Sequence, residues 1–355
     1  MTQLDRYIAR TLLSSVALVM AALLMLGMLF VFIGEQGSVG VGHYTMLDAL
    51  LYAAMSLPQF AVESFPAAAL IGALTGIGIL ARSNELTVMR ASGMSKLRLS
   101  RSVLISATAL IGTAVLVGEF LAQPLAQLAD AQKALAKYSN ASYATSGGAW
   151  VRDDNTILNV QGRSSPGEFG GMLIFELSRD NSLVAIGRAE RATATGPQSW
   201  QLRDYSESRF TADNVTSLHA PERNLRTTAG ADFLQLAITD PGELALRTLY
   251  PAIHYLRTNH LDAKPYEIAF WSRIASTLGI LAAMLFALPF GLGSLRSASL
   301  SARTTFGVAL GVIYIFLQRM VESGTQVFQL DPVLLSGVPT GLLALAAAVM
   351  LWRVR

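Results

Sequence analysis

A run of apolar residues without a single charge, residues 11–33, most limits what this chain can fold into. About 20 such residues cross the hydrocarbon core of a bilayer. Five further apolar runs follow, at residues 46–81, 103–123, 268–290, 305–320 with its flanks, and 333–352. Only 14% of the residues are charged, against roughly 25% in an ordinary soluble domain. The sequence therefore predicts an α-helical membrane protein with six transmembrane helices.

The first run also has an alternative interpretation as a cleavable signal peptide. It is long for the apolar part of a signal peptide, and no clear small-x-small cleavage site follows it. An uncleaved span is the favoured interpretation.

The second run is too long for one straight span. Its 36 residues would rise about 54 Å as a helix, against a core of about 30 Å. Pro58 and Pro66 offer natural breaks, which predicts an interfacial helix at 47–57 and a span at 64–81. Gly72 and Gly76 are spaced for close helix packing, favoured here within one subunit over a dimer seam.

Charge placement predicts how the spans are oriented. The loops 34–48 and 322–332 contain no Lys or Arg, whereas the alternate segments are basic. The basic residues of those segments are Arg6, Arg10, Arg82, Arg90, Lys96, Arg98, Arg101, Arg296, Arg303, Arg353 and Arg355. Because Lys and Arg accumulate on the cytoplasmic side, both termini are predicted to be cytoplasmic and the segment between spans three and four periplasmic.

The segment between spans three and four changes character from helix to strand. A polar helical extension covers 127–137, and short β-type runs separated by turn residues begin near residue 147. Hairpins are predicted at 149–161 and 172–191, with further strands at 199–206, 208–211 and 216–220. This pattern predicts a β-sandwich or jelly roll. The domain boundaries are therefore spans one to three at 1–126, the β domain at 127–245, and a juxtamembrane helix with spans four to six at 246–355.

The loop 81–95 contains a short helix rather than a linker. Residues 84–92 include neither Pro nor Gly, and Gly93 follows as a stop. On a helix, Leu86, Met89 and Gly93 lie along one stripe, with Glu85 near the N-terminus. A helix between two spans is a place where a soluble partner can push on a membrane protein.

No motif in the sequence points to intrinsic catalysis. The chain has no cysteine, no P-loop, no H-E-x-x-H and no G-x-S-x-G, and its four histidines lack metal-ligand spacing. No cofactor, metal or nucleic-acid partner is predicted. A transport or assembly component powered by another protein is favoured over an enzyme.

Several motifs resemble the LptF/LptG family of lipopolysaccharide-export permeases over nearly the whole chain, with greater similarity to the LptG branch. They are LDRYI at 4–8, the small-residue run 66–81, SNELTVMRASG at 83–93, Gly118-Glu119, and GSLRS at 293–297. The resemblance implies a bacterial inner-membrane location and the export of lipopolysaccharide. It also implies an LptF-like second permease, a cytoplasmic LptB-like ATPase dimer and an LptC-like single-span protein as partners.

In that family, residues 84–92 would form the coupling helix that binds the ATPase. The resemblance implies that Glu85 meets an arginine of the ATPase, a pairing that suits a carboxylate at a helix N-terminus. Asn84 and Arg90 would belong to the same contact, and Leu86 and Met89 would supply its apolar part. The alternative is that Glu85 only pairs with Arg82 or Arg90 on a solvated face.

The substrate contacts implied by the resemblance are cations for the lipid phosphates and an apolar path through the β domain. The candidates are Lys133, Lys137 and Arg319, with Phe175 among the alternating residues expected to face the domain interior. One departure concerns span one, because some LptG proteins have a lysine late in this span and residues 26–33 contain no basic residue. The competing functions are a mechanotransmission or lipoprotein-handling permease of the ABC type and, more weakly, a membrane anchor without a transport role.

Overall fold

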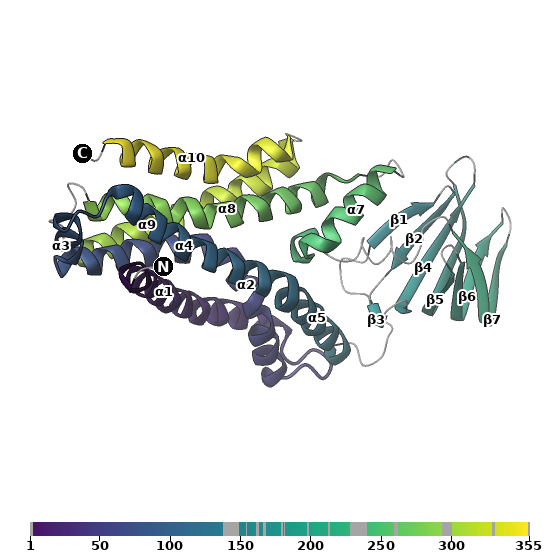
Figure 1. Cartoon of the computed structure of the whole chain (residues 1–355). Helices are drawn as coiled ribbons and strands as arrows, with labels where there is room; N and C mark the ends of the chain where they lie inside the picture. The colour runs from purple at the N-terminus through teal and green to yellow at the C-terminus, as the bar shows by residue number, and fades with distance from the viewer. Residues whose placement is uncertain are drawn as a thin grey trace. The chain divides into compact units, whose positions relative to one another are not determined.

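Helices form both ends of the chain and strands form its middle in the computed structural model (Figure 1). The structure describes residues 3–137, 149–153, 155–160, 163–165, 168–178, 180, 182–196, 199–211, 214–227, 240–258, 262–292, 300–328 and 331–353. It divides into two compact units. The helical unit contains Met1–Gly34, Ala53–Ala126 and Leu244–Arg355, and the β unit contains Glu35–Tyr52 and Gln127–Glu243.

The described helices and helical segments follow the predicted order. They are α1 (Gln3–Glu35), η1 (Gln36–Ser38), α2 (Met46–Arg82), α3 (Glu85–Ala91), α4 (Lys96–Leu116), the π-helical η2 (Val117–Ala122), α5 (Gln123–Lys137), η3 (Pro241–Glu243), α7 (Leu246–Thr258), α8 (Lys264–Leu292), α9 (Leu300–Phe328) and α10 (Pro332–Arg353). Within the described ranges, five helical stretches are long and apolar enough to cross a membrane: Gln3–Ser38, Met46–Arg82, Leu97–Lys133, Lys264–Gly291 and Ser336–Arg353. The predicted fifth span corresponds to a shorter apolar stretch, Thr305–Val321, in α9.

The predicted break in the second apolar run is wrong. Pro58 and Pro66 both lie inside one continuous helix, α2, of 37 residues. Each proline removes one backbone donor, but spans tolerate proline where neighbouring helices surround them and local adjustments satisfy the freed carbonyl groups. The most apolar stretch of α2 is 89% buried, against 11% for that of α1, so α2 is the central helix of its unit.

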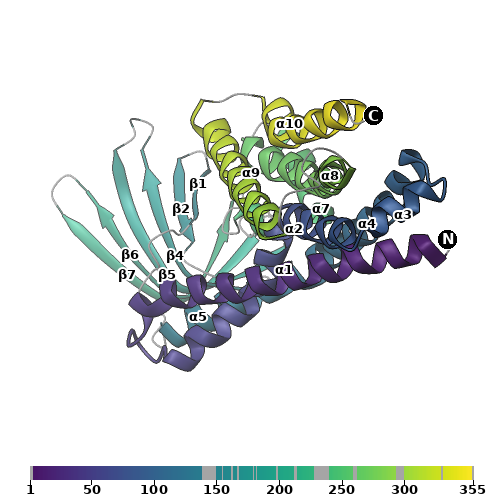
Figure 2. The ribbon, with the colours of Figure 1, turned by 90° about the vertical axis from the view of Figure 1, so that its left-hand side faces the viewer.

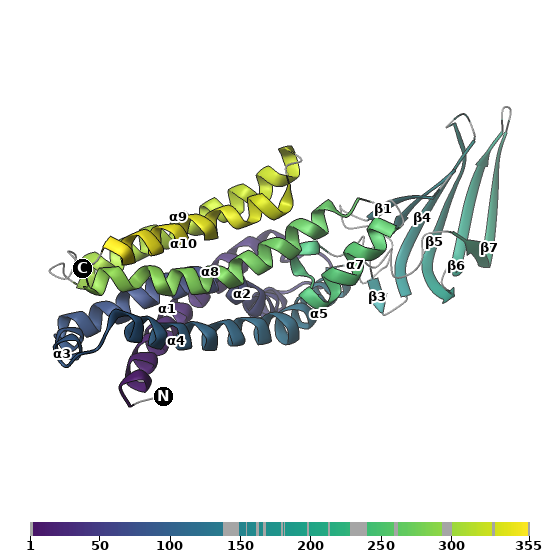
Figure 3. The same cartoon turned by 45° about the horizontal axis from the view of Figure 1, so that its top comes forward.

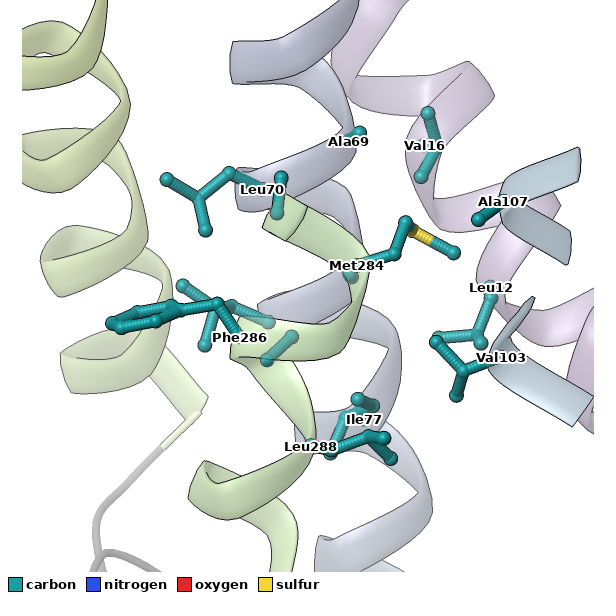
Figure 4. Packing of buried hydrophobic residues seen from close by; sticks show 14 of the residues in the cluster. Leu12, Val16, Ala69, Leu70, Ile77, Val103, Ala107, Met284, Phe286 and Leu288 are labelled. Atoms are coloured by element: carbon teal, nitrogen blue, oxygen red, sulfur yellow. The ribbon is translucent and has the colours of Figure 1, made fainter. Parts of the chain in front are cut away.

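Side chains from α1, α4 and α8 converge on α2 to form the core of the helical unit. Figure 4 shows Leu12 and Val16 of α1, Val103 and Ala107 of α4, and Met284 of α8 pointing toward one another beside Ala69 of α2. The helices α8 and α10 lie side by side (Figures 1 and 3). In both Figure 1 and Figure 2, the start of α1 and the end of α10 lie at the same end of the unit as α3.

The glycine pair of α2 packs against α1 within the chain, as the sequence predicts. A Cβ added to Gly72 would lie 2.5 Å from the Cα of Val16, and one added to Gly76 would lie 3.1 Å from the side chains of Leu12 and Ser15. The missing side chains therefore let the two backbones approach closely, which is the main source of helix association inside a membrane.

The β unit contains one antiparallel sheet in its described part. Its strands are β1 (Ala149–Asp153), β2 (Thr156–Val160), β3 (Arg163–Ser165), β4 (Glu168–Leu177), β5 (Leu183–Gly196), β6 (Ser199–Phe210) and β7 (Val215–Arg226). The order is β1-β2-β4-β5-β6-β7, with β3 paired to β4 (Figure 1). Both predicted hairpins are confirmed, since Asp153 pairs with Thr156 and Leu177 pairs with Leu183. The described strands include no second sheet, so the sandwich or jelly roll stays a prediction.

A buried carboxylate lies on β6 among cations and a tyrosine. Only 4% of the Glu207 side chain is exposed, and it accepts hydrogen bonds from Tyr205, Arg209 and Arg223. Burial acts to raise the pKa of Glu207, but these hydrogen bonds outweigh it and hold the pKa below the ordinary glutamate value. Glu176 completes the cluster through Arg209 and Arg223.

We predict that Gly72→Ala lowers the melting temperature of the purified protein. Alanine favours a helix by about 1 kcal/mol over glycine, but crowding the backbone of Val16 costs about 1–3 kcal/mol. Gly112→Ala is the matched control, because a Cβ there has nothing within 4 Å. Equal melting temperatures for the two variants would contradict close packing at Gly72.

We predict that the β unit loses stability in acid through Glu207. A pKa below the unfolded value gives stability that is present above the ordinary pKa of 4.5 and is lost as the pH falls through the folded pKa. Amide exchange of β6, corrected for intrinsic rates, measures this loss. Glu207→Gln should flatten the pH dependence, and Glu222→Gln, at a 57% exposed glutamate, should not. Identical profiles for wild type and Glu207→Gln would sink the assignment.

Candidate functional site

The loop between α2 and α4 contains the helix that the sequence predicts. The helix α3 spans Glu85–Ala91, Asn84 precedes it in the left-handed region at φ 57°, and Ser92 follows it. Gly93 then adopts φ 92°, a conformation that favours glycine, so the chain reverses direction there. The side chain of Ser95 accepts a hydrogen bond from the backbone of Arg98 and starts α4. Tight turns on both sides therefore hold α3 as a separate element.

The apolar stripe of α3 packs against the helices of its own chain, and its contact with an ATPase stays a prediction. Leu86 and Met89 are 4% and 7% exposed and belong to the same buried cluster as residues of α2 and α8. A Cβ on Gly291 of α8 would lie 3.2 Å from Leu86. The stripe thus anchors α3 to the spans. Val88, 67% exposed, and Arg90, also exposed, are on the open side.

Glu85 is partly buried at the start of α3. Tyr7 of α1 hydrogen-bonds this carboxylate, while its Oε2 atom is buried and has no hydrogen-bond partner. Among the described residues, no ion pair joins Glu85 to Arg82 or Arg90. Leaving a charged oxygen buried without a partner costs free energy, so this atom is a position where an additional cation would be stabilised.

The predicted cation Lys133 lies in a network of the β unit. Its Nζ atom is 2.6 Å from Oε1 of Glu35 and lies 4.4 Å from the centre of the Tyr52 ring. The hydroxyl of Tyr44 donates to the other oxygen of Glu35 at 3.2 Å. Burial and the charge of Glu35 raise the pKa of Tyr44, which stays a neutral donor. Lys133 is therefore already paired with an anion of its own chain.

The predicted cation Lys137 lies one helical turn further along α5 in the same unit. It donates to the hydroxyl of Ser38 at 2.7 Å and lies 5.7 Å from the Tyr44 ring centre. Ser38 and Tyr44 are neutral, so they do not cancel the charge of Lys137, whereas Glu35 cancels that of Lys133. The two lysines thus share one helix face but differ in the charge of their surroundings.

Arg319 and Phe175 occupy different parts of the molecule. Arg319 of α9 lies in the helical unit, 3.6 Å from the carboxylate of Glu63, with 70% of its side chain exposed. Phe175 of β4 stacks on Trp150 of β1 with ring centres 5.6 Å apart. The structure therefore brings Lys133 and Lys137 together in the β unit and keeps Asn84, Glu85, Leu86, Met89 and Arg90 in one helical segment.

The buried cluster of the sheet lies on the face of β4 opposite Phe175, and the role of Phe175 in lipid binding stays a prediction. The buried cluster takes Met172 and Ile174 from this strand, and side chains alternate between faces. Phe175 is therefore on the opposite face, where it is only half-buried. Leu173 and Leu177 share its parity, whereas Ala185 is the buried residue between Val184 and Ile186 on β5.

The sequence interpretation missed the carboxylate partners of its cations. Glu35 was not singled out, although it directly follows the first apolar run and is the first acidic residue after a span without charges. A carboxylate at that place signals a paired cation, because an isolated one beside the hydrocarbon core is costly. In the described part of the chain, no group of three or more His, Cys, Asp or Glu residues could hold a metal ion.

Comparison with known proteins shows the family of this chain. Residues 6–353 match the family described as lipopolysaccharide export system permease LptF/LptG. The chain is 29% identical over 352 residues to the lipopolysaccharide export system permease protein LptG of Escherichia coli, covering 99% of this chain and 98% of that protein. It is 25% identical over 350 residues to the protein of the same name from Haemophilus influenzae, covering 98% and 97%. The chain therefore belongs to the LptF/LptG family of lipopolysaccharide export system permeases.

Proposed function

We propose that this chain is the permease subunit of an ABC transporter that extracts lipopolysaccharide from the bacterial inner membrane. A separate cytoplasmic ATPase supplies the energy, and the extracted lipid passes through the β unit toward the outer membrane. Membership of the family and the similarity to proteins named LptG support this function. An LptF-like permease, an LptB-like ATPase dimer and an LptC-like protein are the proposed partners.

The proposed topology has six spans, with α9 as the fifth, and a periplasmic jelly roll between spans three and four. It places both termini and α3 in the cytoplasm. The location of the start of α1, the end of α10 and α3 at one end of the helical unit supports this arrangement (Figure 1). The basic residues of the loop 81–101 agree with it, because such loops stay on the cytoplasmic side.

The observation that carries the ATPase-coupling role is the unpartnered Oε2 atom of Glu85. A guanidinium group of the ATPase would satisfy this oxygen and sit at the N-terminus of α3, where a carboxylate–arginine pair is geometrically favourable. Exposed Val88 and Arg90 would form the rest of the contact. Leu86 and Met89 would pass the resulting force into α2 and α8, with which they share a buried cluster.

The coupling role predicts that Glu85→Ala and Glu85→Arg weaken co-purification of the ATPase. Removing one partner of a buried charge pair costs about 2–5 kcal/mol, so the affinity should fall more than about tenfold, with Glu85→Arg the more severe. Lipopolysaccharide release from proteoliposomes should fall in parallel. Arg82→Ala is the control, because a pairing confined to this chain would make it equally harmful. Full assembly and release by both Glu85 variants would exclude the coupling role.

A second prediction concerns Lys133 and the lipid phosphates. If the lysine binds phosphate, Lys133→Met lowers lipopolysaccharide release by about tenfold, and the double variant Lys133→Met/Glu35→Gln stays defective. If the lysine only neutralises Glu35, the double variant recovers, because neither charge remains. Photocrosslinking from position 133 measures contact with the lipid directly. Capture of lipoprotein without lipopolysaccharide would support a lipoprotein-handling permease instead.

A further inference from the structure

The carboxylate of Glu119 closes the loop of chain that contains the β domain. Its Oε1 atom accepts the backbone N–H of Leu246 at 2.8 Å, and its Oε2 atom accepts that of Arg247 at 3.4 Å. These are the first two residues of α7, whose N–H groups have no partner inside the helix. The acceptor lies 127 and 128 residues earlier in the chain. A side chain from the end of α4 therefore caps the helix that follows the β domain.

A second side chain, from α8, binds the chain segment that leads into α7. Arg273 of α8 donates to the backbone carbonyl of Leu244, directly before α7. The charges of Glu119 and Glu63 both act on this arginine. Leu244 and Ala245 are 3% and 0% exposed. The Glu119 carboxylate thus accepts from two backbone N–H groups at the start of α7, and the Arg273 guanidinium donates to the backbone carbonyl just before it. We refer to Glu119 and Arg273 together as the clasp.

The local backbone places Glu119 where it can reach α7. It lies in the π-helical segment η2, which interrupts the helical register between α4 and α5. Gly118 beside it is buried, and a Cβ there would lie 3.5 Å from Val62. Such π segments are uncommon and often occur at functional positions. The nearby Arg247–Glu119 ion pair is 3.9 Å long and its arginine is 60% exposed, so the backbone hydrogen bonds dominate the attachment.

The clasp is located at both connections to the β domain. The chain leaves the helical unit after Ala126 and re-enters it at Leu244. Beyond the clasp, α7 packs through Leu249, Ala252 and Leu256, and an ion pair between Arg257 and Glu267 of α8 joins its far end. Glu119 joins η2 directly to the start of α7, and Arg247 of α7 also lies 5.7 Å from the ring centre of Phe120 in η2, so a displacement of α4 reaches α7 through this segment.

We propose that the clasp is a mechanical joint that transmits movement of α4 to α7 and so to the β domain during transport. Glu119 and Arg273 are then positioning residues, which act on the lipid path without touching the lipid. The inference rests on the proposed export function. In this proposal α3 receives the movement at one end of α4, and the clasp passes it to α7 at the other end.

The experiment measures attachment and transport separately in the purified complex with its second permease and ATPase. Since the chain has no cysteine, Leu116→Cys and Tyr250→Cys provide the only spin-label sites on it, at residues 58% and 68% exposed. The wild type should give one narrow distance distribution. Glu119→Ala should broaden it and lower the attached population by about tenfold, as expected for a lost charged cap. Glu119→Gln keeps one carbonyl acceptor, so its attached population should lie between those of the wild type and Glu119→Ala.

The transport measurement is the amount of lipopolysaccharide released per ATP hydrolysed. Glu119→Ala should lower this ratio while the ATPase rate stays at the wild-type value, a split that misfolding would not produce. Glu267→Ala is the matched control, since it removes an α7–α8 ion pair at the other end of α7 and leaves the clasp intact.

Three results would overturn the joint: an unchanged distance distribution in Glu119→Ala, a broadened distribution with a wild-type ratio, or an equal loss in Glu267→Ala. A wild-type complex that releases no lipopolysaccharide would refute the export function instead. The distance measurement would still decide whether the clasp holds α7.

Discussion

Close packing of α2 against its neighbours is the constraint on which the helical unit depends. Inside a bilayer the lipid tails are as apolar as the side chains, so helices associate through backbone approach and side-chain fit. Gly72 permits that approach to α1, and the residues around Met284 fill the space between α2, α4 and α8. The same cluster includes Leu86 and Met89, so packing in the spans also determines where α3 is held.

Much of this architecture could be predicted from periodicity and turn chemistry. The helix α3 was predicted because residues 84–92 lack Pro and Gly and Gly93 follows, and both β hairpins were predicted from their turn residues. The prediction of a break in α2 is wrong because neighbouring helices can accommodate a proline inside a bundle, and the sequence does not show which helices are its neighbours. The sequence does not show which face of β4 is buried, because apolar residues alternate on both faces of this strand and only the fold places Met172 and Ile174 in the buried cluster.

The candidate site was predicted less completely, because its charges act in pairs from distant segments. The sequence singles out Lys133 and Arg319, whereas the structure adds Glu35 and Glu63 as their anionic partners. Nothing local links Glu35 to Lys133, which lie 98 residues apart. The stripe of Leu86 and Met89 could equally face a partner or the chain's own spans, and the structure places it against the spans. Pairing and burial are properties of the tertiary fold, so single-residue inspection misses them.

The division of α3 into a buried and an open side has a consequence for the evolution of the complex. Within seven residues, Leu86 and Met89 belong to the bundle, while Val88 and Arg90 face outward. The two sets interleave along the helix but lie on different sides of it, one buried and one exposed. The contact proposed between α3 and an ATPase can thus change at Val88 and Arg90 without repacking of the membrane core. Exchange of whole α3 segments between homologues should fail where the inward pair differs, even when the outward residues match.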